Sequence, residues 1–332
     1  MSGRFNNRIL LIVLLLLAGI FVITRFTGIK KSGRTLNTDI VQIDTANLTG
    51  VHLVQNSAAG GEELVFTKEG TEWKVSNGQQ TVPVDEAALR SAFAELLNLK
   101  TDQLVARTED KWSGFHVNDS LGTRLTVKEG KKTTLDLVIG RFDYKPVQSP
   151  YGGYGQNRGT GITYVRNYHE DEVYAVQGFL AMTFNRDFNS WRDQTVTRLV
   201  LSRLSRIVFD YPADSGFIAQ KTGEGWMVGG ILADSAAMDS YLNSVSRKRS
   251  ASFMDNPEMA SPPDYRVTFE GDNMQPLEVE AFIRPDDATI LHSSINPESW
   301  FEVPREGLFS DLFKNAGFFL SGDRQEPVSS RQ

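Results

Sequence analysis

The chain of 332 residues contains no cysteine and only four histidines. The lack of cysteine excludes disulfide bonds, thiolate metal sites and a lipid-modified cysteine anchor, and it is compatible with either side of a membrane. His52, His116, His169 and His292 show neither the i, i+4 spacing of a zinc-binding helix nor a neighbouring cysteine. The sequence therefore predicts no metal site.

Motifs that usually mark catalysis or nucleotide binding are also missing. There is no Gly-x-Ser-x-Gly elbow for a nucleophilic serine, no Gly-x-x-x-x-Gly-Lys-Ser/Thr phosphate loop and no EF-hand loop. Adjacent carboxylates such as Asp85–Glu86 and Asp286–Asp287 fall where caps and turns are expected, so we interpret them as solvated. We expect no catalytic residue and no cofactor; an anchored hydrolase is the least favoured alternative.

Positive charge is scarce after the first 34 residues. Those residues hold six basic and no acidic side chains, which leaves 29 basic against 41 acidic residues, a net charge of −12, for the rest of the chain. Binding to nucleic acid requires a basic face that displaces counterions, so no nucleic-acid partner is expected. The same acidity argues against electrostatic adhesion of this part to anionic lipid.

One long apolar run is present at the start. Residues 9–24 carry no charge and lie between Arg8 and Arg25. Extended through Phe26, a helix of this length reaches ~27 Å, close to the ~30 Å of a hydrocarbon core. A cleaved signal peptide is the alternative, but its apolar region is typically ~7–15 residues and ends at a small-x-small site that is absent here. We predict an uncleaved transmembrane anchor at about residues 9–26, in contact with the lipid bilayer.

The basic residues on the two sides of this run are almost balanced, so the positive-inside rule hardly decides the orientation. Long acidic domains cross largely regardless of that rule. The prediction is a single-pass protein of the inner (cytoplasmic) membrane with its bulk extracytoplasmic, or periplasmic. Residues 1–34 would form the cytoplasmic tip, anchor and tether, and residues 321–332 a disordered tail.

Between these ends the chain carries a faint internal duplication. Each copy has a hairpin with Lys, a Gly turn and Trp-x-Val, then a helix capped by Asp, then further strands and a short apolar helix. The predicted segments are 63–75, the helix after Asp85, 123–128, 134–139 and 173–180 in the first copy, and 216–228, the helix after Asp234, 265–270, 277–283 and 300–309 in the second.

Period-two strands joined by tight turns predict antiparallel sheets, and the helical stripes predict helices packed on one face. The predicted fold class is α+β: an N-terminal transmembrane helix followed by two similar halves, 35–195 and 196–320, each an antiparallel sheet with helices on one face. The alternative is two α+β domains that merely share common hairpin chemistry.

The order of several short motifs resembles the domain of unknown function 4340 (DUF4340) family. The motifs are EWKV at 72–75, PVDEAAL at 83–89, LVIG at 137–140, VYAV at 173–176 and WRDQTV at 191–196 leading into IVF at 207–209. This resemblance implies a membrane-anchored extracytoplasmic protein with tandem α+β halves, often encoded beside ABC-type transport components or gliding-motility proteins. It implies no catalytic residues.

Residues 142–160 are unusually rich in glycine and tyrosine. Tyr144, Tyr151 and Tyr154 alternate with glycines, and Arg158 follows. Tyrosine offers a rigid amphipathic surface at low entropic cost, and a loop of this length is typical of function or disorder. We interpret the four side chains as a candidate loop for a partner or ligand; the alternative is a mobile loop or an extended hairpin packed on its own domain.

Trp191 and Arg192 lie at the predicted junction of the halves and are candidates for a contact between them. The favoured function is that of a non-enzymatic, membrane-anchored accessory or scaffold protein. Its partners would be other membrane proteins of an ABC-type transporter or of an envelope or gliding-related assembly. The alternative is a periplasmic module that binds a solute or glycan.

Overall fold

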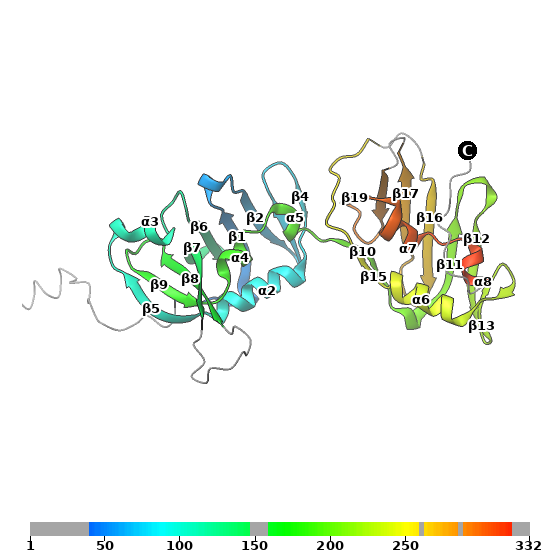
Figure 1. The fold of residues 1–332 in the computed structure, drawn as a ribbon, viewed down its shortest axis with the longest axis horizontal. Coiled ribbons are helices and arrows are strands. Elements are labelled where there is room, and N and C mark those ends of the chain that lie inside the picture. Colours follow the sequence, from blue (N-terminus) through cyan, green and yellow to red (C-terminus); the bar gives the residue numbers. More distant parts are fainter. Residues whose placement is uncertain (1–39, 147–158, 259–261, 285–287, 321–332) are drawn as a thin grey trace, which may run out of the picture. The chain divides into compact units, whose positions relative to one another are not determined.

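The computed structural model describes residues 40–146, 159–258, 262–284 and 288–320. The chain divides into two units, residues 1–40 and residues 41–332, and every element named below belongs to the second unit. Large antiparallel sheets dominate this unit, with a few short helices between the strands (Figure 1). The fold is mixed α+β, which confirms the predicted class.

The first sheet has nine strands, and all neighbouring strands are antiparallel. In order across the sheet they are β4 (Thr81–Pro83), β3 (Glu72–Ser76), β2 (Glu63–Glu69), β1 (Leu48–Val54), β6 (Thr123–Glu129), β7 (Lys132–Pro146), β8 (Gly159–Asn167), β9 (Val173–Gln177) and β5 (Lys100–Ala106). Leu53 on β1 is paired with Leu64 on β2 and Leu125 on β6, and all three are fully buried. Period-two alternation therefore gives this sheet an inner face that holds the main core.

The second large sheet has eight antiparallel strands. Their order is β14 (Ile231–Leu232), β13 (Gly225–Val228), β12 (Phe217–Thr222), β11 (Leu204–Asp210), β16 (Tyr265–Gly271), β17 (Leu277–Ile283), β18 (Thr289–Ser293) and β19 (Trp300–Val303). Ile207, Val267 and Phe301 are fully buried in its core. A two-stranded sheet pairs β10 (Thr195–Arg198) with β15 (Arg247–Arg249).

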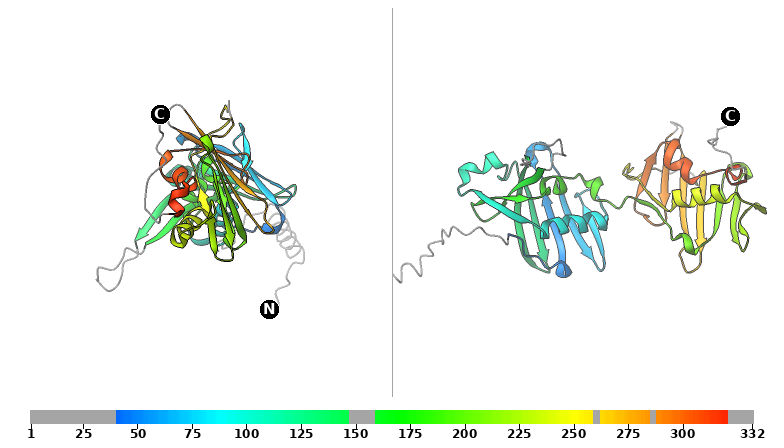
Figure 2. Two further views of the ribbon diagram at one scale, coloured as in Figure 1. Left: turned by 90° about the vertical axis from the view of Figure 1, so that its right-hand side faces the viewer. Right: turned by 60° about the horizontal axis from the view of Figure 1, so that its bottom comes forward.

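Helices α2 (Glu86–Leu97) and α6 (Ser235–Val245) each cross the strands of one large sheet (Figure 2). The predicted caps are confirmed: the Asp85 carboxylate accepts hydrogen bonds from the amides of Ala87 and Ala88, and Asp234 accepts one from Ala237. The buried stripes are Leu89, Ala92, Phe93 and Leu96 on α2, and Met238, Tyr241, Leu242 and Val245 on α6. Leu97, the last residue of α2, is 43% exposed.

The remaining helices are short: α3 (Trp112–Phe115), α4 (Leu180–Phe184), α5 (Phe188–Trp191), α7 (Ser310–Leu312) and α8 (Ala316–Leu320), with a π turn at Arg305–Phe309. Trp112 and Phe115 of α3 pack against a buried cluster that includes Val138. The Val138 side chain points away from the inner face that holds Leu137 and Ile139. The outer face of the first sheet is therefore covered by α3 over β7. The prediction that helices lie on one face does not hold for this sheet.

Four central strands were not predicted from the sequence: β1, β8, β11 and β18. The predicted loop 142–160 is strand at both described ends, because β7 continues to Pro146 and β8 begins at Gly159 in register with it. The Phe142 ring stacks on Phe179 at 5.4 Å between ring centroids, which holds this end of the hairpin against the domain. Residues 147–158 lie outside the described residues.

Within the described ranges, no helix has the length and apolar character needed to cross a bilayer. The predicted anchor at residues 9–26 lies outside those ranges.

Candidate functional site

The most buried charge of the first sheet belongs to Arg166 on β8. Its position is opposite Val138 on the outer face of the sheet, yet its side chain is only 1% exposed. The segment that carries α3 covers it: Trp112 stacks on the guanidinium at 3.7 Å from the ring centroid to Cζ. Burial of a cation in this way requires compensating acceptors.

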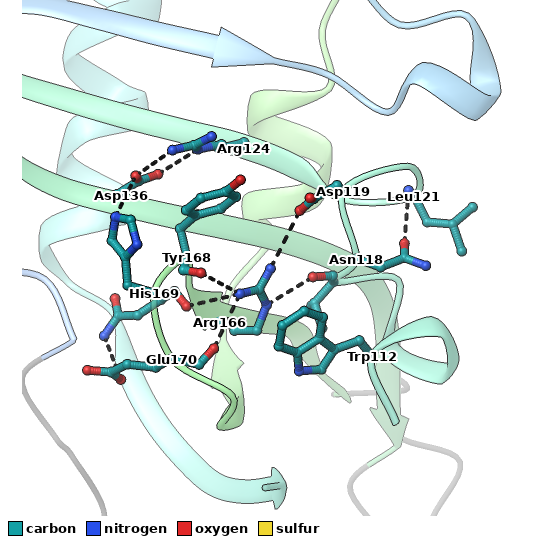
Figure 3. Close-up of polar contacts among 12 residues, drawn as sticks. Trp112, Asn118, Asp119, Leu121, Arg124, Asp136, Arg166, Tyr168, His169 and Glu170 are labelled. Carbon is teal, nitrogen blue, oxygen red and sulfur yellow. Dashed lines mark hydrogen bonds and ion pairs between the residues drawn. The ribbon is translucent and has the colours of Figure 1, made fainter. Parts of the chain in front are cut away.

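Backbone carbonyls supply those acceptors (Figure 3). The Arg166 Nε donates to the Val117 carbonyl at 3.1 Å, and Nη1 donates to the carbonyls of Tyr168 at 2.7 Å and Glu170 at 3.2 Å. The Asp119 carboxylate lies 3.8 Å from Nη2 and is largely exposed. Arg166 therefore ties two separate backbone segments together, and burial lowers the pKa of its guanidinium from the ordinary value.

A second arginine lies beside it on the same face. Arg124 on β6 makes two hydrogen bonds to the Asp136 carboxylate, at 2.8 and 2.7 Å, and its guanidinium lies 3.3 Å from the ring centroid of Tyr168. The hydrogen bonds that Arg124 donates to Asp136 raise the pKa of Arg124 above its ordinary value, against the smaller opposing effect of burial. His169 Nε2 approaches the same carboxylate at 3.6 Å.

These residues form one cluster, which we call the outer-face cluster: Trp112, Arg124, Asp136, Arg166, Tyr168 and His169. The Trp112 indole N–H is also used, because it donates to the Asp171 carbonyl at 3.0 Å. The polar groups of the cluster are thus directed at one another and at backbone carbonyls. Their arrangement attaches the α3 segment to the sheet.

The sequence did not single out Arg166, Arg124 or Trp112, because their spacing matches no motif. Their contacts join β6, β8 and α3, so only the tertiary fold brings them together. One usable signal was Arg166 itself, a charged residue at the end of the largely apolar segment 162–165. An arginine buried in such a strand needs an aromatic or carbonyl partner, so its presence indicates a structural contact.

Of the predicted loop residues, only Tyr144 is among the described ones. It lies on β7 paired with Gly161 and is 48% exposed. Two residues before it on the same strand, Phe142 stacks on Phe179, itself 48% exposed. Tyr151, Tyr154 and Arg158 lie outside the described residues, so the grouping of the four side chains stays a prediction.

Trp191 and Arg192 have different surroundings. The Trp191 ring is 1% exposed and contacts the rings of Phe66, at 5.2 Å, and Phe184, at 6.3 Å. Trp191 thus packs in the core of the first sheet. The Arg192 guanidinium, also buried, donates to Asp255 at 2.8 Å and lies 3.8 Å from the ring centroid of Phe253.

Asp255 is a further residue that the sequence did not single out. Burial opposes its ionisation, but the hydrogen bonds from Arg192 and Gln80 outweigh it and hold its pKa below the ordinary value. Arg249 on β15 pairs similarly with Asp85, the cap of α2. Two arginine–aspartate pairs therefore connect segments that are far apart in the sequence.

The four histidines lie in separate places and have different neighbours. His52 pairs with Glu63 at 2.7 Å, and His292 stacks on Trp300 with Glu280 at 3.6 Å. His116 has a left-handed backbone at the end of α3. In the part of the chain that the structure describes, no three histidine or carboxylate residues gather into a potential metal site.

Comparison with known proteins gives a family but no characterised relative. No curated protein and no solved structure matches the chain. The model of the family described as "Domain of unknown function (DUF4340)" matches residues 73–268, which is more than half of the 332 residues. The matched range runs from β3 through β16 and includes the outer-face cluster and Arg192. The chain therefore belongs to the DUF4340 family.

Proposed function

We propose that this protein is a non-enzymatic, membrane-anchored accessory subunit whose folded part is extracytoplasmic. The observation that carries the proposal is the uncharged run at residues 9–24 ahead of a large folded part in which buried charges are engaged in structural contacts. A protein built this way acts by holding a binding surface at the membrane. Its partners would be membrane proteins of an ABC-type transport system or of an envelope or gliding-related assembly.

We also infer that the two large sheets are repeats of one unit. Their strand orders correspond, β4-β3-β2-β1-β6-β7-β8-β9 with β14-β13-β12-β11-β16-β17-β18-β19. The pairing register breaks at equivalent points, between Leu48 and Gly50 on β1 and between Leu204 and Arg206 on β11. A shared irregularity of this kind supports duplication more strongly than shared hairpins do.

The helix caps support the same inference. The amide of Asp85 donates to the Trp191 carbonyl at 2.8 Å, and the amide of Asp234 donates to the Phe319 carbonyl at 2.8 Å. Both acceptors are buried aromatic residues of a short helix that follows the last strand of its sheet. In each predicted half, the amide of the helix-cap aspartate would thus bind the same kind of carbonyl, that of a buried aromatic residue after the last strand.

Membrane topology can be tested with the full-length protein, because the chain has no native cysteine. Two variants with one cysteine each, Ser2→Cys and Ser330→Cys, would be treated with a maleimide that does not cross the cytoplasmic membrane. We expect Ser330→Cys to react in cells with a permeabilised outer envelope and Ser2→Cys to react only after lysis. The control Leu14→Arg/Leu16→Arg places charges in the apolar run and should release the protein from membranes. Reaction of Ser2→Cys alone in unlysed cells would overturn the orientation.

The accessory role can be tested by cross-linking in membranes and purification of the protein in detergent. We expect another membrane protein to co-purify in a defined ratio. Replacement of Tyr151, Tyr154 and Arg158 by alanine should lower its recovery without changing the melting temperature. Migration of the solubilised protein alone, with no cross-linked membrane partner, would contradict the role.

A further inference from the structure

A groove separates α2 from the hairpin of β2 and β3 on the inner face of the first sheet. Its volume is about 480 Å³, within the range of roughly 300–1,000 Å³ of small-ligand pockets. The side chains that matter here are Lys68, Trp73, Leu89, Arg90, Phe93 and Leu97. They combine an apolar lining with two cations.

Local geometry gathers these side chains. Lys68 and Trp73 are directly paired across β2 and β3, so their side chains lie next to each other on one face. Arg90, Phe93 and Leu97 follow at helical spacing on α2 and therefore form one stripe. Trp73 is half-buried and Leu97 is 43% exposed, which leaves apolar surface open along the groove.

The second large sheet has the same pairing at Lys221 and Trp226, yet it differs just before its strand β11. There Leu201, three residues before Leu204, is packed against the core. The first sheet has Thr45 three residues before Leu48, and both residues line the groove. A shorter, polar side chain thus stands at the position where the second sheet has a leucine, and it borders the groove together with Trp73.

The charges on the groove do not cancel. Lys68 is half-buried and forms no side-chain ion pair or hydrogen bond with a described residue. Arg90 approaches Glu86 only at 3.8 Å, with both side chains largely exposed. Two cations against one carboxylate leave a positive edge on an otherwise acidic protein.

We propose that this groove binds a single-chain anionic amphiphile, a long-chain carboxylate. The chain lies over Trp73 and Phe93, where it covers exposed apolar surface, and the carboxylate lies at Lys68 within reach of Arg90. The proposal does not depend on the anchored accessory role, since the groove belongs to one folded half and would bind its ligand with or without a protein partner.

The test uses full-length protein in lipid nanodiscs and a photoreactive dodecanoate, with labelled peptides mapped by mass spectrometry. Mapping separates the groove from lipid and detergent, which also take up the probe. We expect labelling to concentrate on peptides that contain Trp73 and Phe93. Lys68→Gln should reduce it about fivefold, since loss of one partly exposed ion pair weakens binding by about that factor.

Two further variants sharpen the test. Thr45→Leu should fill the space as Leu201 does and bring labelling to background, while Lys221→Gln on the second sheet should leave it unchanged. A photoreactive dodecyltrimethylammonium of equal chain length should label the groove far less than dodecanoate. Equal labelling by both probes, equal labelling around Trp226, or no loss in both Lys68→Gln and Thr45→Leu would overturn the proposal. Melting temperatures near that of the unmodified protein would show that each variant is folded.

Discussion

Arg166 shows how a single residue can hold a covering segment on a sheet. A lysine could place its charge at the same point, but its single ammonium could not reach carbonyls on both sides in a fixed plane or stack on Trp112. The guanidinium does both. Its loss would leave the buried Val117 carbonyl and the partly buried Tyr168 carbonyl without this donor.

We expect Arg166→Met to lower the free energy of unfolding by about 3 kcal/mol, because the methionine fills the space but satisfies none of the acceptors. Arg166→Lys should recover only part of this loss. Urea denaturation of the purified protein would measure both. A lysine variant as stable as the unmodified protein would show that charge alone matters at this position.

Gly140, the last residue of the LVIG motif, is fixed by close approach of the backbone. A β-carbon there would lie 2.2 Å from the Phe115 carbonyl oxygen and 2.6 Å from a methyl group of Val117. Gly140→Ala should therefore cost about 2 kcal/mol through overpacking. Gly114→Ala on α3, where a β-carbon would meet nothing within 4 Å, is the matched control and should be neutral or slightly stabilising. Equal melting temperatures of the two variants would contradict this account.

At the scale of elements, α2 and α6 each begin with an aspartate cap, but the two caps differ in their hydrogen-bond and ion-pair partners. Asp85 accepts two amide hydrogen bonds and also pairs with Arg249, whereas Asp234 accepts one amide hydrogen bond. The cap of α2 therefore supports both its helix and a link to β15.

Asp234→Ala should cost about 1 kcal/mol, the usual value for loss of a cap. Asp85→Ala should cost more, because Arg249 also loses its partner. A double-mutant cycle with Arg249→Gln isolates that extra contribution, which should be below about 1 kcal/mol because the arginine is half-exposed. A coupling energy indistinguishable from zero would mean that the ion pair adds nothing to the cap.

Elements with strong local signals were predictable from the sequence. The hairpins at Trp73 and Trp226 have a Gly turn between alternating strands, and the helices after Asp85 and Asp234 have a cap and a periodic stripe. β1 and β8 were missed because Gly50 and Gly161 interrupt their alternation, although neighbouring strands hold both in place. The contacts of Arg166, Arg192 and Asp255 depend on residues distant in sequence, so no local pattern could reveal them.

At the scale of the whole molecule, two carboxylates link stability to pH. Burial opposes ionisation of Asp85, but hydrogen bonds from Arg249 and from the amides of Ala88 and Ala87 outweigh it and hold its pKa below the ordinary value. The pKa of Asp255 is lowered in the same way by Arg192. A carboxylate with a lowered pKa in the folded state stabilises the fold above the unfolded pKa of about 3.9 and loses that contribution as the pH falls through the folded pKa.

We therefore expect the melting temperature to fall as the pH is lowered from roughly 5 toward 3. The double variant Asp85→Asn/Asp255→Asn should start from a lower melting temperature at pH 7 and change less over this range. Asp272→Asn, on an exposed turn, serves as the control and should follow the unmodified protein. Parallel curves for the double variant and the control would exclude these two groups as the source of acid sensitivity.

The position of β5 has a consequence for synthesis of the chain. β5 closes the edge of the first sheet beside β9, although β6, β7 and β8 lie between them in the sequence. During synthesis β5 leaves the ribosome long before β9. The backbone groups of β5 that pair with β9 therefore have no partner until Gln177 has emerged. An apolar strand in that position would invite association with other nascent chains. The polar start of β5, Lys100 to Gln103, thus disfavours association of nascent chains, in addition to forming an edge of the finished sheet.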